Sequence, residues 1–514
     1  MAEITKPYNL LKAKLEAGEY DIAVTATSEQ VKESEYSNSV PYTQDENLYY
    51  EYSGSQYYIV TGRKTASTDI TISSEYDDGQ NGIWPVREIG ANAFSGKDVV
   101  SVKIPTSIKL IGESAFYNCA SLTTVEIVRL EEIAVYFLNN RNWTDITCSY
   151  EVDGEATEKI MTISGNGMCR ISIPANATKL YFGGTNTFGK KEKTTVISEF
   201  AHGRCFRCDE KIDENGSFYA VDYEYESSEA DDFVIIGAKA FQKCTAITEM
   251  NIPNTVVDIG DYSLADCKAL KTITFDAHSS LTRIGNGAFA SCSSLACSLV
   301  FPFYLDSIGR FSFSICTALT YVKLNSRLRI IDSSAFGTCF ALETVVVPDD
   351  SILESIGVVA FGSCKKLKSF TIPETVREFY PNVFNSLNES LELVTFKRHY
   401  GWFFAYGEKG YQQAIPPEQF KDGYALAALL TVNTNASMNA SYNGGLSDPA
   451  ILRFPWTNIS QMPAPDISLS LDGVLSITDS TGIADMFTIY AKKAGSDDSN
   501  YQAAAWIKDL RKSQ

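Results

Sequence analysis

The sequence predicts an α/β repeat solenoid in which each coil supplies one strand and one short helical return. A nine-residue motif, Ile-Gly-x-x-Ala-Phe-x-x-Cys, recurs down the chain, and its aromatic position returns every 23 to 25 residues between Phe241 and Phe384. A second element, Leu-x-x-Val-x-Ile-Pro in its cleanest form, follows the motif. Self-similarity at this period is typical of solenoids, which usually present a binding surface rather than a catalytic site.

The motif is predicted to form the return of each coil. Its second residue is a Gly suited to a tight turn, and the Ala-Phe stretch that follows is too brief for a full helix, so we expect one or two helical turns. The best copies are residues 111–119, 236–244, 284–292 and 356–364, and weaker copies are residues 89–97, 259–267, 308–316 and 331–339.

The second element is predicted to be the strand. Its apolar positions end in a period of two, which is the period of side chains along a strand. The clearest copies are residues 122–127, 247–253, 342–348 and 367–373. No single coil can bury its own apolar face, so the stacking of successive coils has to supply the core.

Together these features resemble the BspA-like class of leucine-rich repeat. Motif, strand and Pro recur together in at least seven copies, and residues 57–62, 68–72 and 84–90 look like the lead-in that opens such arrays. The resemblance covers about residues 57–127 and 234–396. It implies a leucine-rich repeat array on a cell surface with a role in adhesion or protein binding, and it brings neither catalytic residues nor a cofactor.

The chain is too long for one compact core of ordinary size, so we expect an array with flanking modules. The predicted segments are an N-terminal capping region (1–56), the first leucine-rich repeats (57–127), a β-rich insertion (128–232), the main leucine-rich repeat array (233–396), an aromatic-rich cap and linker (397–462) and a small immunoglobulin-like β-domain with a terminal helix (463–514).

Local patterns support the flanking segments. The Tyr-rich residues 49–58 indicate a hairpin that caps the first coil, and a contact patch is the alternative. Residues 128–232 hold strand-like runs without a clean motif, which indicates either a β-rich insertion or degenerate coils. Residues 463–493 resemble the strands of an immunoglobulin-like domain, and residues 501–511 have apolar positions at roughly helical spacing.

Composition argues against several classes of partner. The chain has 44 Lys and Arg against 63 Asp and Glu, for a net charge of −19, which opposes binding to nucleic acid or to an anionic membrane. We expect no membrane insertion, because no run of about 18 apolar residues is present. The first residues lack a charged leader followed by an apolar stretch, so no secretory signal peptide is visible.

The 12 cysteines fall into two groups. We expect the cysteines of the motif to be buried free thiols stacked as a ladder, because equivalent positions in a solenoid point the same way. These are Cys119, Cys244, Cys267, Cys292, Cys316, Cys339 and Cys364. The others are Cys148, Cys169, Cys205, Cys208 and Cys297.

Candidates for metal or cofactor chemistry are few. His202, Cys205 and Cys208 form the best cluster, but zinc needs about four ligands, so we interpret Cys205 and Cys208 as ordinary loop cysteines and predict neither a metal nor a cofactor. Residues 77–82 and 209–216 are rich in acidic side chains but lack the full spacing of a calcium loop that ends in Glu, so we expect hairpin turns.

The exposed side of the predicted strands is the candidate ligand-binding surface. In Leu-x-x-Val-x-Ile the apolar side chains point inward, so the position before Val and the position after it are exposed. The predicted surface is made of Lys103, Thr124, Glu126, Glu249, Asn251, Thr272, Thr274, Tyr321, Lys323, Thr344, Val346, Ser369 and Thr371. These side chains suit hydrogen-bonded contact with a protein or a glycan, and simple solvation of a sheet face is the alternative.

Two hypotheses of function follow. The first is a non-enzymatic recognition or adhesion protein, displayed on a microbial cell surface, that binds a protein or glycan on a host or neighbouring cell through the solenoid face and the insertion. The second is a structural, decoration or receptor-binding component of a phage or virus-like particle, which the absence of a visible signal peptide favours. Both place the protein outside the cell, and both leave the partner and the oligomeric state open.

Overall fold

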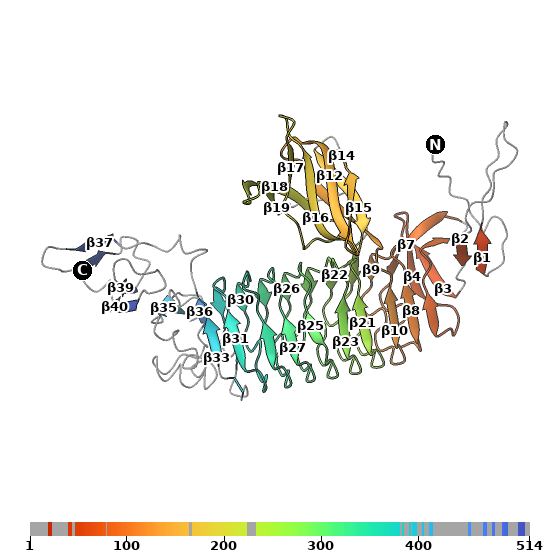
Figure 1. Ribbon diagram of the computed structural model, residues 1–514. Helices are drawn as coiled ribbons and strands as arrows, with labels where there is room; N and C mark the ends of the chain where they lie inside the picture. The colour runs from red at the N-terminus through yellow and green to blue at the C-terminus, as the bar shows by residue number, and fades with distance from the viewer. Residues whose placement is uncertain are drawn as a thin grey trace. The chain divides into compact units, whose positions relative to one another are not determined.

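The computed structural model describes residues 47–397, apart from 79, 164–166, 224–232, 381–382, 385–389 and 392, together with short strands outside that range. The chain divides into two compact units, one made of residues 1–295 and 302–304 and the other of residues 296–301 and 305–514. Both units contain stacked coils of β-solenoid type (Figure 1).

In the first unit, one ladder of strands runs through the residues that precede the motif Gly. Its order is β3 (Leu48–Tyr52), β4 (Tyr58–Arg63), β7 (Ile83–Ile89), β9 (Leu110–Ile111), β20 (Val234–Ile236), β22 (Val256–Ile259) and β24 (Arg283–Ile284). From β4 onward neighbouring strands are parallel. β6 (Glu75–Asp77) pairs with β7 in the antiparallel sense.

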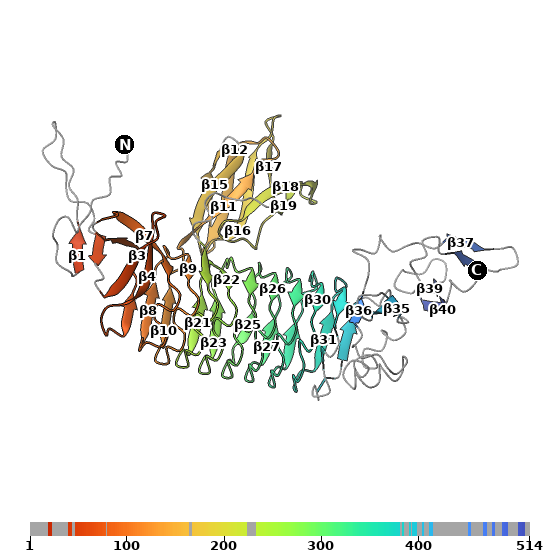
Figure 2. The same ribbon diagram turned by 180° about the vertical axis from the view of Figure 1, so that it is seen from behind.

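A second set of parallel strands carries the predicted strand element. One sheet has the order β5 (Asp69–Thr71), β8 (Ser101–Ile104), β10 (Thr124–Ile127), and another pairs β21 (Glu249–Ile252) with β23 (Thr272–Phe275). In Figures 1 and 2 these strands lie along the side of the array away from the insertion. A coil thus contributes two short strands, where the sequence pattern predicted one.

The predicted helical return is wrong, and with it the α/β class: no helix is present in the described residues. The fourth and eighth motif residues have left-handed backbone angles, with φ of 57° at both Ser114 and Asn118. A right-handed helix cannot pass through two such residues four positions apart. The same positions are left-handed at Lys239 and Lys243, Tyr262 and Asp266, Phe311 and Ile315, Ser334 and Thr338, and Val359 and Ser363.

The left-handed residues turn alternate backbone N–H groups toward the next coil. The Ser114 N–H donates to the Ala238 carbonyl at 2.9 Å, and the Phe116 N–H donates to the Ala240 carbonyl at 2.7 Å. Between them, N–H groups close turns within the coil, as when Tyr117 N donates to Ser114 O at 3.0 Å. The return is therefore a series of turns and also a third ladder between coils.

The motif Gly is required by close approach between coils. A Cβ on Gly112 would lie 2.5 Å from the Ile89 carbonyl oxygen of the preceding coil, which no real side chain tolerates. The φ of Gly112 is not in the left-handed region. The tight turn that the Gly was predicted to allow is instead made by the two left-handed positions after it.

Stacked Phe and Cys side chains fill the solenoid core. The ring centroids of Phe94 and Phe116 are 4.9 Å apart, and those of Phe116 and Phe241 are 5.2 Å apart, with nearly parallel planes. The Cys119 thiol donates to the Phe94 carbonyl of the preceding coil at 3.1 Å. All seven motif cysteines are buried thiols that form no disulfide, which confirms the predicted ladder.

Residues between β10 and β20 form a separate body rather than degenerate coils (Figures 1 and 2, yellow). One sheet has the order β14 (Thr162–Ile163), β15 (Met168–Pro174), β11 (Glu132–Leu138), β18 (Cys205–Ile212), β19 (Phe218–Tyr223), and the other has the order β13 (Glu155–Ile160), β12 (Thr144–Val152), β16 (Thr178–Thr185), β17 (Lys191–Lys193). Trp143, Phe137 and Phe182 are in its buried core.

The array is continuous across the point where the insertion leaves. Ile111 of β9 pairs directly with Ile236 of β20, although 125 residue positions separate them in sequence. The Phe116 ring stacks on Phe241, and the Cys244 thiol donates to the Phe116 carbonyl at 3.1 Å. The coils on either side of the insertion are therefore direct neighbours.

In the second unit, the same two strand positions recur. One ladder has the order β26 (Ser307–Ile308), β28 (Ile330–Ile331), β30 (Ser355–Ile356), β32 (Glu378–Phe379), followed by antiparallel β36 (Ile451–Arg453), β34 (Phe403–Ala405) and β35 (Tyr411–Ala414). The other position holds the sheet β25 (Ser298–Val300), β27 (Tyr321–Lys323), β29 (Thr344–Val346) and the pair β31 (Ser369–Ile372) with β33 (Leu393–Phe396).

Near the N-terminus, β1 (Glu19–Ile22) pairs with β2 (Val40–Thr43). The predicted Tyr-rich hairpin is confirmed, because β3 and β4 are antiparallel with Tyr52 opposite Tyr58. Since β4 in turn pairs with β7, the hairpin covers the edge of the first ladder. Most of residues 1–46 of the predicted capping region lies outside the described residues.

The C-terminal segment holds two hairpins, β37 (Asp466–Leu469) with β38 (Leu475–Thr478) and β39 (Met486–Ala491) with β40 (Gln502–Lys508). The predicted terminal helix is wrong, because pairing with β39 outweighs the helix preference of its alanines. The rest of residues 463–514, like most of the predicted linker, lies outside the described residues, so the immunoglobulin-like domain stays a prediction.

Strain at the left-handed positions gives a first prediction. Val359 is β-branched and has a φ of 57°, a conformation that costs an L-residue about 1–2 kcal/mol. We expect Val359→Gly to raise the free energy of unfolding by up to about 1 kcal/mol, because the entropy cost of Gly, about 0.5–1 kcal/mol, is smaller. Val358→Gly, at the adjacent position without a left-handed φ, is the control and should be destabilising. Thermal unfolding followed by circular dichroism measures both, and equal losses in the two variants would contradict this account.

The cysteine ladder gives a second prediction. Burial raises the pKa of the Cys119 thiol to about 11 and the pKa values of Cys292 and Cys339 to about 12, from an ordinary 9.0. The folded state therefore favours the neutral thiol, and the stability that this confers is complete below pH 9 and is lost as the pH rises toward 11–12.

We expect the native chain at pH 8 to react with a thiol reagent first at the half-buried Cys297, and the motif cysteines to react only on unfolding. The urea midpoint should fall between pH 8 and pH 10 as unfolded thiols ionise. Rapid labelling of several motif thiols in the native chain, located by peptide mass spectrometry, would rule out the buried ladder.

Candidate functional site

The candidate site is the exposed side of the second strand position, which we call the array face. In β8 the side chains of Val102 and Ile104 are buried, and Lys103 between them is exposed. The same alternation holds in β21, where Met250 and Ile252 are buried and flank the exposed Asn251. All thirteen predicted surface residues are exposed or half-buried, and none is buried.

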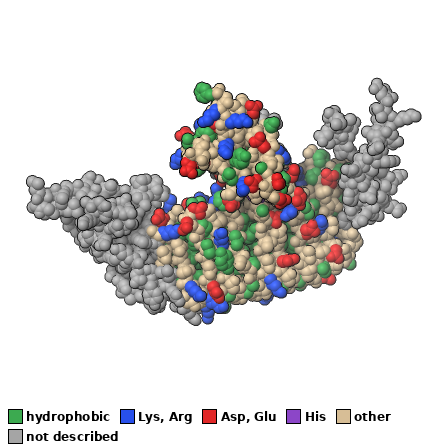
Figure 3. Space-filling model, in the orientation of Figure 1, with side chains coloured by type: hydrophobic (Ala, Val, Ile, Leu, Met, Phe, Trp, Pro, Cys, Tyr) green, Lys and Arg blue, Asp and Glu red, His purple; other side chains and the backbone are tan. Residues whose placement is uncertain are grey.

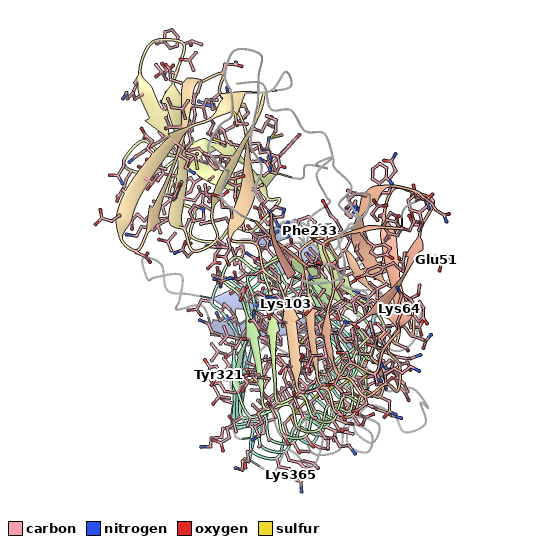
Figure 4. All side chains as sticks on the ribbon, turned by 90° about the vertical axis from the view of Figure 1, so that its right-hand side faces the viewer. Glu51, Lys64, Lys103, Phe233, Tyr321 and Lys365 are labelled. Carbon is pink, nitrogen blue, oxygen red and sulfur yellow. The ribbon has the colours of Figure 1, made fainter. Side chains whose placement is uncertain are left out.

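In the first unit, parallel pairing places array-face residues in rows across the strands. Glu126 lies opposite Lys103, and their side chains form an ion pair of 3.0 Å with both side chains 54% exposed. Such an exposed pair contributes little to stability, so both groups stay available to a ligand. Figure 4 labels Lys103 on this part of the array.

A second row joins polar side chains by hydrogen bonds. The Thr274 hydroxyl donates to the Asn251 Oδ1 at 2.8 Å, and the Asn251 amide donates to Asp276 Oδ1 at 3.0 Å. Asn251 lies opposite Thr274, and Glu249 lies opposite Thr272. These bonds hold the Asn251 amide in one orientation on the surface.

The array face is hollowed where the strand pairing is interrupted. β10 and β21 belong to separate sheets, and a cavity of about 270 Å³ lies between their residues. Five of the predicted residues line it: Thr124, Glu249, Asn251, Thr272 and Thr274. Thr123, Val125 and Met250 complete the lining. The hollow follows from the break in the ladder, which the sequence pattern did not reveal.

In the second unit, β25, β27 and β29 form a continuous part of the array face. Ser298, Tyr321 and Thr344 lie side by side in one row, and Val300, Lys323 and Val346 lie in the next. Figure 4 labels Tyr321. Ser369 and Thr371 occupy the same positions on β31.

Sequence reasoning missed several residues of the array face, among them Ser101, opposite Thr124, and Thr395, opposite Thr371. Ser298 and Val300 were overlooked because Leu-Ala-Cys-Ser-Leu-Val at 295–300 departs from the repeat pattern. Asp69 and Thr71 lie opposite Ser101 and Lys103 but precede the first full motif. The pairing of parallel strands reveals them, and Val300 adds an apolar side chain that is 49% exposed.

The interpretation of Cys205 and Cys208 as loop residues is wrong, because both are buried on β18. They lie three positions apart on a strand, so they face opposite sides: Cys208 joins the core with Trp143, and Cys205 packs in a separate cluster with Met168. Within the described ranges, no group of three or more His, Cys, Asp and Glu could hold a metal ion.

The two acidic segments are hairpin turns, as expected. Asp78 accepts backbone hydrogen bonds from Gln80 and Asn81, both at 2.8 Å, in the turn between β6 and β7. Hydrogen bonds from these amides outweigh desolvation and lower the pKa of Asp78 to about 2. Asp213 accepts in the same way from the Asn215 and Ser217 N–H groups, at 2.9 and 2.8 Å.

Direct contacts attach the insertion to the array within the first unit. The ring nitrogens of His278 lie 2.8 Å from the Phe200 carbonyl oxygen and 2.6 Å from the Ala177 carbonyl oxygen, and the His278 ring stacks on Phe200. The Asn254 amide exchanges two hydrogen bonds of 3.1 Å with the Leu130 backbone.

Phe233, labelled in Figure 4, packs edge-on against His202 where the chain returns to the array.

The part of the chain that the structure describes contains no membrane-spanning helix.

A family model matches the repeats of this chain. The family model described as "BspA type Leucine rich repeat region (6 copies)" matches residues 85–190, 214–299 and 296–401. The first two of these matches include residues of the insertion, where strand pairing shows a different fold. No curated protein matches the chain.

Among solved structures, a leucine-rich repeat protein of T. pallidum (TpLRR) is 17% identical, covers 63% of this chain and 90% of its own, and has a TM-score of 0.31. The pneumococcal vaccine antigen PcpA is 16% identical, covers 69% and 80%, and has a TM-score of 0.29. A leucine-rich repeat protein from Bacteroides ovatus is 17% identical, covers 69% and 88%, and has a TM-score of 0.27.

The family model covers more than half of the 514 residues, and most of the matched residues lie in the coils described above. The chain therefore belongs to the family of BspA-type leucine-rich repeat proteins.

Proposed function

We propose that this chain is a non-enzymatic recognition protein, displayed on a microbial cell surface, that binds a protein or glycan of a host or neighbouring cell through the array face and the insertion. The observation that carries the proposal is the array face itself. It presents rows of hydroxyl, amide and charged side chains on a backbone held by parallel pairing, and it is hollowed between β10 and β21.

The geometry of the array face favours recognition over simple solvation. Thr124, Asn251 and Thr272 are short side chains, so their ordering in a complex costs little rotamer entropy. The hollow gives a partner side chain or sugar a place to insert, and Glu249 at its edge supplies a carboxylate. Leucine-rich repeat proteins generally mediate protein interactions, and family membership also supports display at the cell surface.

Several reactive side chains among the described residues have structural roles, which supports a role without catalysis. Burial raises the pKa of motif thiols such as Cys119 and Cys292, so these are poor nucleophiles at neutral pH. Both ring nitrogens of His278 face backbone carbonyls, and His202 accepts a hydrogen bond from the Ala134 N–H at 3.1 Å.

The test is capture of a partner by the full chain and by variants of the array face. The immobilised chain is exposed to surface extracts of host epithelial cells, to extracts of neighbouring bacteria and to purified phage particles, and captured molecules are identified by mass spectrometry. We expect Glu249→Lys to reduce capture of a cell-surface protein or glycan about tenfold or more, because a buried contact at such a hollow is worth at least about 1.4 kcal/mol.

Glu113→Lys is the matched control, since it makes the same charge change on a return segment where Glu113 forms only an exposed 3.4 Å ion pair with Lys239. It should capture as the unchanged chain does. Equal capture by both variants would show that the array face does not contribute to binding. Capture of a phage structural protein alone would make the chain a particle component instead.

A further inference from the structure

The insertion carries a second, larger hollow on its outer surface. Its volume is about 710 Å³, which lies within the range of about 300–1,000 Å³ that small-molecule sites occupy. Three elements line it: the exposed side of the sheet β13-β12-β16-β17, the turn that joins β16 to β17, and the turn between β18 and β19. We call this hollow the insertion groove.

A glycine in the middle of the sheet creates the groove. Gly183 on β16 lies between Thr147 on β12 and Lys193 on β17. A Cβ at Gly183 would lie 3.3 Å from the Thr147 hydroxyl oxygen and 3.8 Å from the Lys193 Cβ, so any larger side chain would occupy the space. Tyr181, two residues earlier, points to the same side and forms part of the wall.

The lining is polar and holds three lysines and three acidic residues. Lys190, Lys191 and Lys193 all line the groove, in a chain whose net charge is −19. Within the described ranges, no carboxylate lies within 4.0 Å of any of these three ammonium groups. Figure 3 shows Lys and Arg side chains (blue) at the end of the insertion that is far from the array.

The acidic residues of the lining, Asp145, Glu158 and Glu192, match the lysines in number but bind other groups. Asp145 accepts a hydrogen bond from the Thr144 hydroxyl at 3.3 Å. Glu192 is held by two other partners, since its carboxylate accepts from the Trp143 indole N–H at 2.8 Å and from the Asn186 amide at 2.7 Å. Glu158 accepts from the Ser149 hydroxyl at 3.2 Å, on the β13 side of the groove. The lysines are on the β17 side, so a ligand meets ammonium groups along one wall.

We propose that the insertion groove binds an anionic oligosaccharide. The lysines would bind its carboxylate or sulfate groups, Thr147, Thr185 and Asn215 would exchange hydrogen bonds with its hydroxyls, and the Tyr181 ring would pack on a sugar face. A protein partner needs an apolar pocket for an anchoring side chain, and the groove has no aliphatic side chain in its lining. The proposal deepens the proposed recognition function, on which it rests, by naming the ligand class of the insertion.

The test is calorimetric titration of the full chain at physiological salt with four probes of equal length. They are a galacturonic acid hexamer, a sulfated chondroitin hexasaccharide, a neutral galactose hexamer and hexaglutamate. We expect one of the two anionic sugars to bind at least tenfold more tightly than both the neutral sugar and the peptide, and the preferred one identifies the anionic group. Binding of hexaglutamate as tight as that of both sugars, tightest binding of the neutral hexamer, or no sugar binding would overturn the proposal.

Variants locate the binding. We expect the double variant Lys191→Gln, Lys193→Gln and the single variant Tyr181→Leu each to weaken sugar binding about tenfold or more. Lys179→Gln is the control, because Lys179 is on β16, the strand of Tyr181, but outside the groove lining, in a 2.8 Å ion pair with Glu151. An unchanged tryptophan emission spectrum, to which the buried Trp143 is one of five contributors, together with an unchanged thermal unfolding curve shows that the chain stays folded. Sugar binding that survives both groove variants would place the site elsewhere.

The array-face variant separates the two proposals. Glu249→Lys should leave sugar binding unchanged even where it reduces capture of the partner. If the sugars fail to bind while Glu249→Lys still reduces capture, only the insertion groove proposal is lost. If the groove variants weaken sugar binding while Glu249→Lys leaves capture of the partner unchanged, only the array-face proposal is lost.

Discussion

Backbone hydrogen bonding between successive coils is the interaction on which the rest of this structure depends. Each coil offers three sets of N–H and C=O groups to its neighbour: two short parallel strands and the return, in which Ser114 and Phe116 donate to Ala238 and Ala240. The left-handed residues, the motif Gly and the stacked Phe and Cys side chains all allow successive coils to approach closely enough for these hydrogen bonds. A coil that forms these hydrogen bonds stacks on the array whatever its outward side chains are. Those side chains can therefore be used for recognition.

The same constraint explains how the array accommodates a separate body in its middle. Ile111 pairs with Ile236 as if no residues intervened. The insertion therefore adds the entropy cost of closing a long loop but removes no strand pairing from the array. His278 and Asn254 then fix the insertion to the array through backbone carbonyls and an amide. The chain thus offers two different surfaces for recognition, one that follows the repeat and one that does not.

The sequence predicts what depends on residue type. Burial of Val102, Ile104 and the motif cysteines, and exposure of Lys103 and Asn251, follow from apolar periodicity. The return escapes prediction because its left-handed positions carry residues as different as Ser114 and Val359, which have no common backbone preference. The hollow beside Glu249 lies at a break in strand pairing, and the insertion groove lies at Gly183 between two neighbouring strands. A single sequence does not show which strands are neighbours. β40 was mistaken for a helix because its partner strand, not its alanines, decides its conformation.

The most direct test of the central claim is hydrogen exchange at the Phe116 amide after the insertion is excised. Residues 131–232 would be replaced by a short Gly/Ser linker, and exchange at this amide, whose acceptor is the Ala240 carbonyl, would be compared with that in the full chain. If contacts between coils alone hold the array together, the Phe116 amide stays protected to a similar degree in both chains. Loss of protection at Phe116 in a chain whose other coils remain protected would show that the insertion, and not the ladder, holds these two coils in place.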